Sequence, residues 1–193
     1  MSRPNASDLS YVIPVDFLPP AALPLPGRLG LTRAPGRWAP GRSTDADSWL
    51  REDLNVLAGI HDAKVLVTLL QPHEIAELGD LKGAARRAGL AWLSFPIPDM
   101  GIPSDLTASR RVVDEILHVL EGGHAVVVHC WGGLGRAGTI ASCCLVARGT
   151  PPAQALALVR AARDGAVQSE AQEQFVRSFG EEGEAAGRGA DCC

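Results

Sequence analysis

Residues 125–139 read AVVVHCWGGLGRAGT, and their pattern indicates the class of fold. Its first four residues are apolar and mostly β-branched, which predicts a short buried strand. The glycines at 132, 133 and 135 then predict a tight turn, and a helix is expected to start near Arg136. A strand that passes through a glycine-rich turn into a helix is typical of α/β proteins.

The rest of the chain also alternates between strand-like and helical patterns. Strands are expected at residues 11–18, 28–32, 64–70 and 91–95, the first two at a sheet edge. Helices are expected at residues 43–61, 72–81, 82–89, 104–120, 136–148, 151–163 and 169–179. The alternation predicts an α/β fold in which a central, mostly parallel sheet is flanked by helices and residues 125–128 form the central strand.

A chain of 193 residues has the length of one globular domain. Eight of its 14 prolines lie in the first 40 residues, so residues 1–27 are expected to form an irregular N-terminal segment. Residues 28–180 are expected to form the functional domain. Residues 181–193 are rich in Glu, Gly and Ala without apolar periodicity, which predicts a flexible tail.

The composition argues against several classes of partner. The net charge is −4 at pH 7, so no basic field is present to hold nucleic acid or an anionic membrane. The apolar runs are far shorter than the roughly 20 residues that a membrane span needs. The N-terminus lacks a long apolar stretch with a cleavage site, so a cytoplasmic location is expected.

The five cysteines do not have the spacing of a disulfide framework. Their number is odd and four of them stand in two adjacent pairs, 143–144 and 192–193, so reduced thiols are expected. No cysteine pair has metal-ligand spacing, and no metal or organic cofactor is expected. Cys143 and Cys144 are expected to pack in the core. Cys130, at the end of the central strand, is the remaining candidate for chemistry.

The glycine-rich turn has the composition of an anion site. Glycines allow successive backbone N–H groups to point into one concavity, and the following helix adds the positive end of its dipole. A phosphate dianion fits such a cradle. The predicted phosphate-binding amides are those of Trp131, Gly132, Gly133, Leu134, Gly135 and Arg136. The guanidinium of Arg136 would bind two phosphate oxygens as a planar fork.

The positive electrostatic potential of this turn also acts on Cys130. A helix N-terminus and a guanidinium favour the thiolate form of a cysteine, which is the nucleophilic form. His129 is expected to support the arrangement by hydrogen bonding to the loop. A buried cysteine in a glycine-rich turn is the alternative, but this combination of residues has a chance expectation of only roughly 10⁻⁵. The cradle interpretation is therefore favoured.

The segment HCWGGLGRAGT, residues 129–139, resembles the His-Cys-x5-Arg signature of the cysteine-based protein tyrosine and dual-specificity phosphatases. The Gly-Gly-Leu-Gly-Arg form of this loop is similar to the kinase-associated (cyclin-dependent kinase inhibitor 3-like) branch. The resemblance extends over residues 27–179. It implies a monomeric protein phosphatase that uses a phosphocysteine on Cys130 to hydrolyse phosphotyrosine, or phosphothreonine and phosphoserine, in protein substrates.

Asp99 is the candidate general acid. The segment FPIPDMG, residues 95–101, is similar to a mobile loop that carries an aspartate in this family. An acid that protonates the leaving oxygen contributes about 10²- to 10⁴-fold, and Asp99 follows a predicted strand at the ligand-binding edge of the sheet. An ordinary turn aspartate is the alternative. Asp105 is the second candidate, although Ser104 and Asp105 are more simply explained as the start of a helix that Ser104 caps.

Gln168 is a further candidate catalytic residue. Residues 166–175 more weakly resemble the glutamine loop of tyrosine phosphatases, in which Gln168 would position the water that hydrolyses the phosphocysteine. A helix-capping amide is the alternative. The chain departs from the family at Ala137, where Ser or Thr is usual.

Three other functions stay open on the residues alone. A phosphoinositide phosphatase would often carry lysines between Cys130 and Arg136, and this loop has none. A catalytically weak phosphotyrosine-binding module is suggested by Ala137, but Cys130 and Asp99 are both retained. A sulfurtransferase would share the cysteine but has no need of Asp99.

Overall fold

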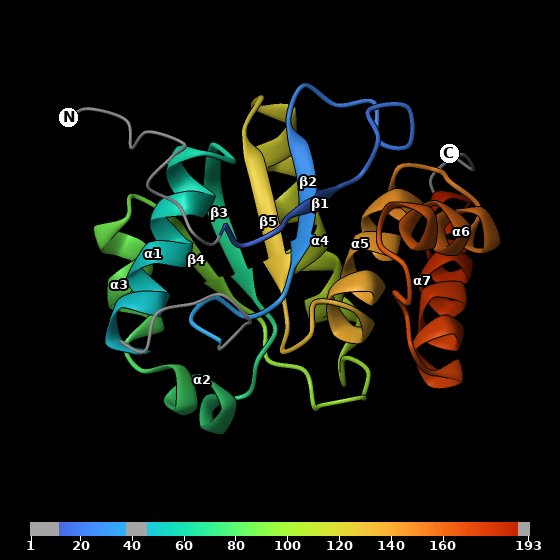
Figure 1. Cartoon of the computed structure of the whole chain (residues 1–193). Helices are drawn as coiled ribbons and strands as arrows, with labels where there is room; N and C mark the ends of the chain where they lie inside the picture. Colours follow the sequence, from blue (N-terminus) through green and yellow to red (C-terminus); the bar gives the residue numbers. More distant parts are fainter. Residues whose placement is uncertain (1–11, 38–45, 189–193) are drawn as a thin grey trace.

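The computed structural model of the protein describes residues 12–37 and 46–188, with side chains for residues 12–37 and 48–181. Its strands are β1 (Asp16–Phe17), β2 (Arg28–Thr32), β3 (Ala63–Thr68), β4 (Ala91–Ser94) and β5 (Ala125–His129). Its helices are α1 (Ala46–Gly59), α2 (Pro72–Leu78), α3 (Leu81–Arg87), α4 (Leu106–Glu121), α5 (Gly135–Ala147), α6 (Pro152–Ala162) and α7 (Glu170–Arg188). Helices cover both faces of the sheet (Figure 1).

The strands form one sheet in the order β1-β2-β5-β3-β4, with β5 in the centre as predicted. β2, β5, β3 and β4 are parallel, and β1 is antiparallel to β2. The predicted α/β fold with a mostly parallel sheet is therefore confirmed. The expectation that residues 28–32 lie at a sheet edge is wrong, because β1 covers the free side of β2. β1 itself is shorter than the predicted strand at 11–18.

Two apolar clusters fill the space between the sheet and the helices. Val126 and Val128 of β5 point into the cluster beneath α4 to α7, whereas Val127 points into the cluster beneath α1 and α3. All five residues of β5 are buried. This double burial explains the continuous apolar run of the sequence, since a parallel strand covered on both faces needs no polar alternation.

Both termini of the domain differ from the sequence-based expectation. Ile13, Leu18 and Leu23 are buried in the core, so residues 12–27 pack as part of the domain, and the rest of the predicted N-terminal segment lies outside the described residues. The prediction of irregular structure after residue 180 is wrong up to Arg188, because α7 continues to that residue. Glu and Ala, which are abundant there, have high helix propensity, and this outweighs the missing apolar periodicity.

The N-terminus of α4 also corrects one prediction. Asp105, not Ser104, is the N-cap residue, and its side chain accepts a hydrogen bond from the Ala108 N–H at 3.1 Å. An aspartate is at least as good an N-cap as a serine and adds a favourable charge. Asp105 is thus used for capping.

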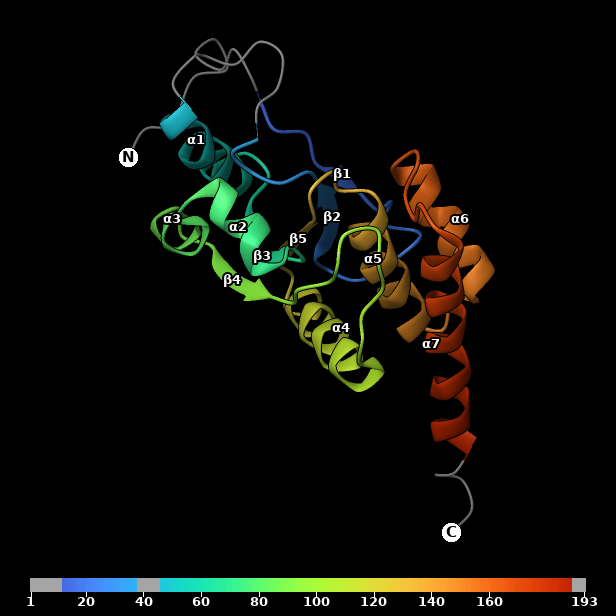
Figure 2. The same cartoon turned by 90° about the horizontal axis from the view of Figure 1, so that it is seen from below.

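The carboxyl ends of the parallel strands meet at one edge of the sheet. His129 is paired with Thr32 of β2 on one side and with Thr68 of β3 on the other, and Thr68 is paired with Ser94 of β4. Figure 2 looks onto this edge and shows the loop after β4 passing close to the start of α5.

In the part of the chain that the structure describes, no helix has the length and apolarity to cross a membrane.

Candidate active site

Cys130 lies between the end of β5 and the glycine-rich loop, with only 3% of its surface exposed. The Gly133 N–H donates to Cys130 Sγ at 3.3 Å. Gly133 has φ +75°, and a Cβ at this position would lie 2.2 Å from the backbone carbonyl oxygen at the end of β2. The loop therefore closes around the sulfur only because residue 133 has no side chain.

Three consecutive carbonyl groups of the loop are held from outside. The donors are His129 Nδ1 to Cys130 O (3.2 Å), Ala34 N and Arg37 Nη1 to Trp131 O (3.1 and 3.0 Å), and Arg163 Nη2 to Gly132 O (3.0 Å). In a trans peptide the C=O and the next N–H point in opposite directions. The amides of residues 131–133 are therefore directed toward the inside of the loop. The contact between the residue 133 amide and the cysteine sulfur agrees with this direction.

The side chain of Arg136 is fixed by Glu74, which sequence analysis did not single out. Arg136 Nη1 and Nη2 donate to the two carboxylate oxygens of Glu74 at 2.7 and 2.9 Å, and Nη1 also donates to Ile97 O at 3.1 Å. Burial alone would lower the pKa of Arg136, but the Glu74 carboxylate reverses this and raises it. Burial would likewise raise the pKa of Glu74, and hydrogen bonds from Arg136 and from the Gln71 N–H lower it. Both groups are therefore charged at neutral pH.

Asp99 reaches the same guanidinium from the solvent side. Its Oδ1 lies 2.9 Å from Arg136 Nη2, and its side chain is 70% exposed. The loop that carries it is fastened at Gly101, whose carbonyl accepts a hydrogen bond from Gln172 Nε2 at 3.1 Å. Asp99 therefore lies at the mouth of the cradle, opposite the buried Glu74.

Gln168 also contacts the loop, because its Oε1 accepts a hydrogen bond from the Gly135 N–H at 3.2 Å. The adjacent helix start holds it there. Ser169 and Gln172 form a reciprocal capping box: the Gln172 N–H donates to Ser169 Oγ, and Gln172 Oε1 accepts from the Ser169 N–H, both at 3.3 Å. The same oxygen accepts from the Gln168 N–H at 2.9 Å. Gln172 therefore joins the segment of Gln168 to the loop of Asp99.

Three other residues that the sequence singled out lie in the protein interior. Cys143 and Cys144 are fully buried, as expected for core residues, and burial raises the pKa of both thiols. Ala137 is buried, and the nearby Thr139 hydroxyl donates to Gly135 O at 2.9 Å. The structure shows no hydrogen bond from Thr139 to Cys130.

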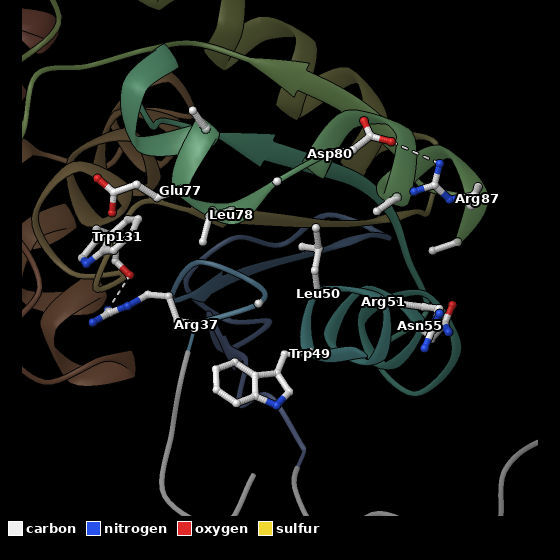
Figure 3. A pocket seen from close by; sticks show the side chains of 15 residues that line it. Arg37, Trp49, Leu50, Arg51, Asn55, Glu77, Leu78, Asp80, Arg87 and Trp131 are labelled. Carbon is white, nitrogen blue, oxygen red and sulfur yellow. Dashed lines mark hydrogen bonds and ion pairs between the residues drawn. The ribbon is translucent and has the colours of Figure 1, made fainter. Parts of the chain in front are cut away.

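A groove of about 1040 Å³ adjoins the loop at Trp131. Figure 3 shows Arg37 and Trp131 at one end of it, with Trp49, Arg51 and Asn55 of α1 on another wall. The guanidinium of Arg37 lies 4.9 Å from the centre of the Trp131 ring. The groove therefore leads from the glycine-rich loop along α1 toward Asp80 and Arg87.

Comparison with known proteins identifies the family. Residues 39–150 match the family described as "Polymorphic toxin system, DSP-PTPase phosphatase". The chain belongs to the DSP-PTPase phosphatases. This phosphatase is 29% identical over 181 residues to cyclin-dependent kinase inhibitor 3 of Rattus norvegicus, a match that covers 90% of the chain and 82% of the relative. The predicted relation to the kinase-associated branch is confirmed.

Solved structures agree with this assignment. Kinase-associated phosphatase with its catalytic-site cysteine replaced by serine matches 91% of this phosphatase and 98% of its own chain, with a TM-score of 0.79 and 22% identity. Tk-PTP in its active form matches 86% of this phosphatase and 96% of its own chain, with a TM-score of 0.68 and 27% identity. The solved structures therefore show the fold of this family, and the family match and the relatives make the protein a protein phosphatase.

Proposed function

We propose that this phosphatase hydrolyses phosphomonoesters in two steps, with Cys130 as the nucleophile and a phosphocysteine as the intermediate. The observation that carries the proposal is the placement of Cys130 Sγ inside a loop that also brings in Arg136, with Asp99 at the mouth. A thiolate, a fixed guanidinium and a carboxylate are the groups that this chemistry needs.

In the first step the loop amides and Arg136 bind the phosphate. Glu74 and Ile97 O occupy three of the N–H bonds on the terminal nitrogens of Arg136, and Asp99 accepts the fourth. The substrate phosphate takes the place of Asp99 at Nη2 and adds a contact to Nε–H. Cys130 Sγ attacks phosphorus, the bond from phosphorus to the substrate oxygen breaks, and protonated Asp99 donates its proton to that oxygen.

In the second step water attacks the phosphocysteine. Asp99 accepts a proton from the water, the sulfur–phosphorus bond breaks, and the Cys130 thiolate is restored with release of phosphate. Gln168 positions this water, and its amide must first turn away from the Gly135 N–H. The reach of Gln168 to the loop supports this role.

The substrate is a protein that carries phosphotyrosine, or phosphothreonine and phosphoserine. The polypeptide around the phosphorylated side chain would lie in the groove beside Trp131, where Arg51 is exposed. Neutralising Arg51 with Arg51→Gln should raise KM for phosphopeptides and leave hydrolysis of a small aryl phosphate unchanged. The cytoplasmic location and the monomeric state stay predictions.

Turnover of p-nitrophenyl phosphate in the presence of a metal chelator tests the proposal. The wild type should be active, Cys130→Ser inactive, and Arg136→Lys strongly impaired, because lysine keeps the charge and loses the planar fork. Arg148→Lys is the matched control, since Arg148 forms an exposed pair with Glu121. Hydrolysis by Cys130→Ser at the wild-type rate would refute the mechanism.

A further inference from the structure

Three side chains on adjacent strands form a chain of hydrogen bonds that ends at Cys130. Trp92 Nε1 of β4 lies 2.8 Å from Thr68 Oγ1 of β3, and Thr68 Oγ1 lies 2.8 Å from His129 Nε2 of β5. His129 Nδ1 then lies 3.2 Å from Cys130 O. Thr68 and His129 have no exposed surface, so water does not compete for these bonds.

In each of these hydrogen bonds only one of the two atoms can carry the proton. A carbonyl oxygen only accepts, so the contact with Cys130 O requires a proton on His129 Nδ1. Burial lowers the pKa of His129 to about 4, so the ring is neutral at pH 7 and its Nε2 accepts. The Thr68 hydroxyl must then donate to Nε2. An indole N–H only donates, so Trp92 occupies a lone pair of the Thr68 oxygen.

These three hydrogen bonds fix the orientation of the His129 imidazole ring. A ring turned by half a rotation would present carbon atoms to both Thr68 and Cys130 O and would lose both hydrogen bonds. With the ring held, His129 Nδ1–H binds the Cys130 carbonyl, and the trans peptide directs the Trp131 N–H into the loop. The Thr68 hydroxyl therefore acts on the phosphate cradle without touching it.

We propose that Thr68, held by Trp92, is a positioning residue of the phosphatase, which through His129 fixes the first amide of the phosphate-binding loop. The inference rests on the proposed function, because it concerns the same loop. The sequence signature includes His129 but neither Thr68 nor Trp92, which lie on other strands.

Thr32 offers a matched control on the opposite side of His129. It is paired with His129 across β2 and β5, as Thr68 is across β3 and β5. It is equally buried, and its hydroxyl donates to Pro14 O at 2.6 Å instead of to the imidazole. Thr32→Val leaves the Pro14 carbonyl without its donor, whereas Thr68→Val leaves both His129 Nε2 and the Trp92 N–H unpaired, so only Thr68→Val affects His129.

The first experiment measures the affinity of orthovanadate for the whole protein. Thr68→Val should weaken vanadate binding about tenfold, the effect of losing one hydrogen bond, and lower kcat/KM for an aryl phosphate by a similar factor. Thr68→Ser should restore both values. Thr32→Val should also lower the unfolding midpoint, because it breaks a buried hydrogen bond, and leave vanadate affinity unchanged. An equal loss of vanadate affinity in Thr68→Val and Thr32→Val would overturn the proposal. So would a Thr68→Ser variant whose vanadate affinity stays as low as that of Thr68→Val.

The second experiment observes the imidazole directly. ¹⁵N spectra of the wild type at pH 7 should show His129, assigned by its loss in His129→Asn, as the Nδ1–H tautomer. The Nε2 signal of His129 should shift in Thr68→Val and, by a smaller amount, in Trp92→Phe. The Trp92→Phe variant replaces Thr68→Val in this test if the valine variant does not fold. A charged ring or an Nε2–H tautomer would overturn the proposal. Absence of vanadate binding by the wild type would instead refute the proposed function, since the spectra do not depend on it.

Discussion

The carboxylate of Glu74 binds the guanidinium of Arg136 through both of its oxygens, at 2.7 and 2.9 Å, and the arginine side chain is only 2% exposed. This two-point contact fixes the plane of the guanidinium as well as its position. It also decides which N–H bonds of Arg136 can face a substrate. The preorganised fork of the cradle is therefore a property of two residues from α2 and α5.

Replacing Glu74 by Gln should lower kcat/KM for an aryl phosphate by about 10- to 100-fold, because hydrogen bonds to charged groups are each worth about 1.5–3 kcal/mol. Arg136 would then be free to pair more closely with Asp99 and to compete with the substrate. Steady-state kinetics check this. Glu115→Gln, an exposed change on α4, is the control. Unchanged kinetics of Glu74→Gln would show that the fork does not depend on this pair.

The buried His129 should make the protein sensitive to acid. Its pKa falls from 6.5 to about 4 on folding, so between these values the unfolded state binds more protons and stability is lost as the pH decreases. The full effect is about 3 kcal/mol. Denaturation curves measured from pH 7 to pH 4 should show the free energy of unfolding decreasing with pH, and this slope should be smaller in His129→Asn. An identical slope in the variant would assign the acid sensitivity to other groups.

The sequence predicted the parts of the site that lie close together in the chain. The strand, the glycines and Arg136 are within 12 residues of one another, and the local rules for strands, turns and helix starts apply to them directly. Asp99 and Gln168 needed the family resemblance, because a carboxylate after a strand and an amide before a helix are common in any protein.

Glu74 was missed because nothing in its local sequence separates it from an ordinary residue in the first turn of a helix. The usable signal was topological: it follows the carboxyl end of β3, at the same sheet edge as Cys130. Arg163 was missed for a related reason. It follows α6, yet it pairs with Asp16 and donates to Gly132 O, and such contacts depend on helix packing that sequence periodicity does not specify.

Asp99→Asn should slow substrates with poor leaving groups much more than those with good ones, because only the former need a proton at the leaving oxygen. A series of aryl phosphates of graded leaving-group pKa measures this. Asp105→Asn is the matched control, since asparagine is also a good N-cap for α4. An equal loss across the series for Asp99→Asn would assign proton transfer to another group.

Ala137 should make breakdown of the phosphocysteine the slow step. The family usually has a hydroxyl here, and the Thr139 hydroxyl donates to Gly135 O instead of to the departing sulfur. One hydrogen bond to a charged group is worth about 10- to 100-fold in rate. Rapid mixing should show a burst of aryl alcohol, and Ala137→Ser should raise the steady-state rate and shrink the burst. No burst, with kcat unchanged in Ala137→Ser, would mean that the second step is not limiting.

Trapping the phosphorylated enzyme shows whether Cys130 carries the phosphoryl group during turnover. The wild type is mixed with a good aryl phosphate, quenched within one turnover, digested, and analysed by mass spectrometry for the peptide that contains Cys130. We expect one phosphoryl group on the sulfur of Cys130, absent from Cys130→Ser and abundant in the wild type because Ala137 slows its breakdown. Rapid substrate hydrolysis with no phosphoryl group on Cys130 at any quench time would rule out the phosphocysteine mechanism.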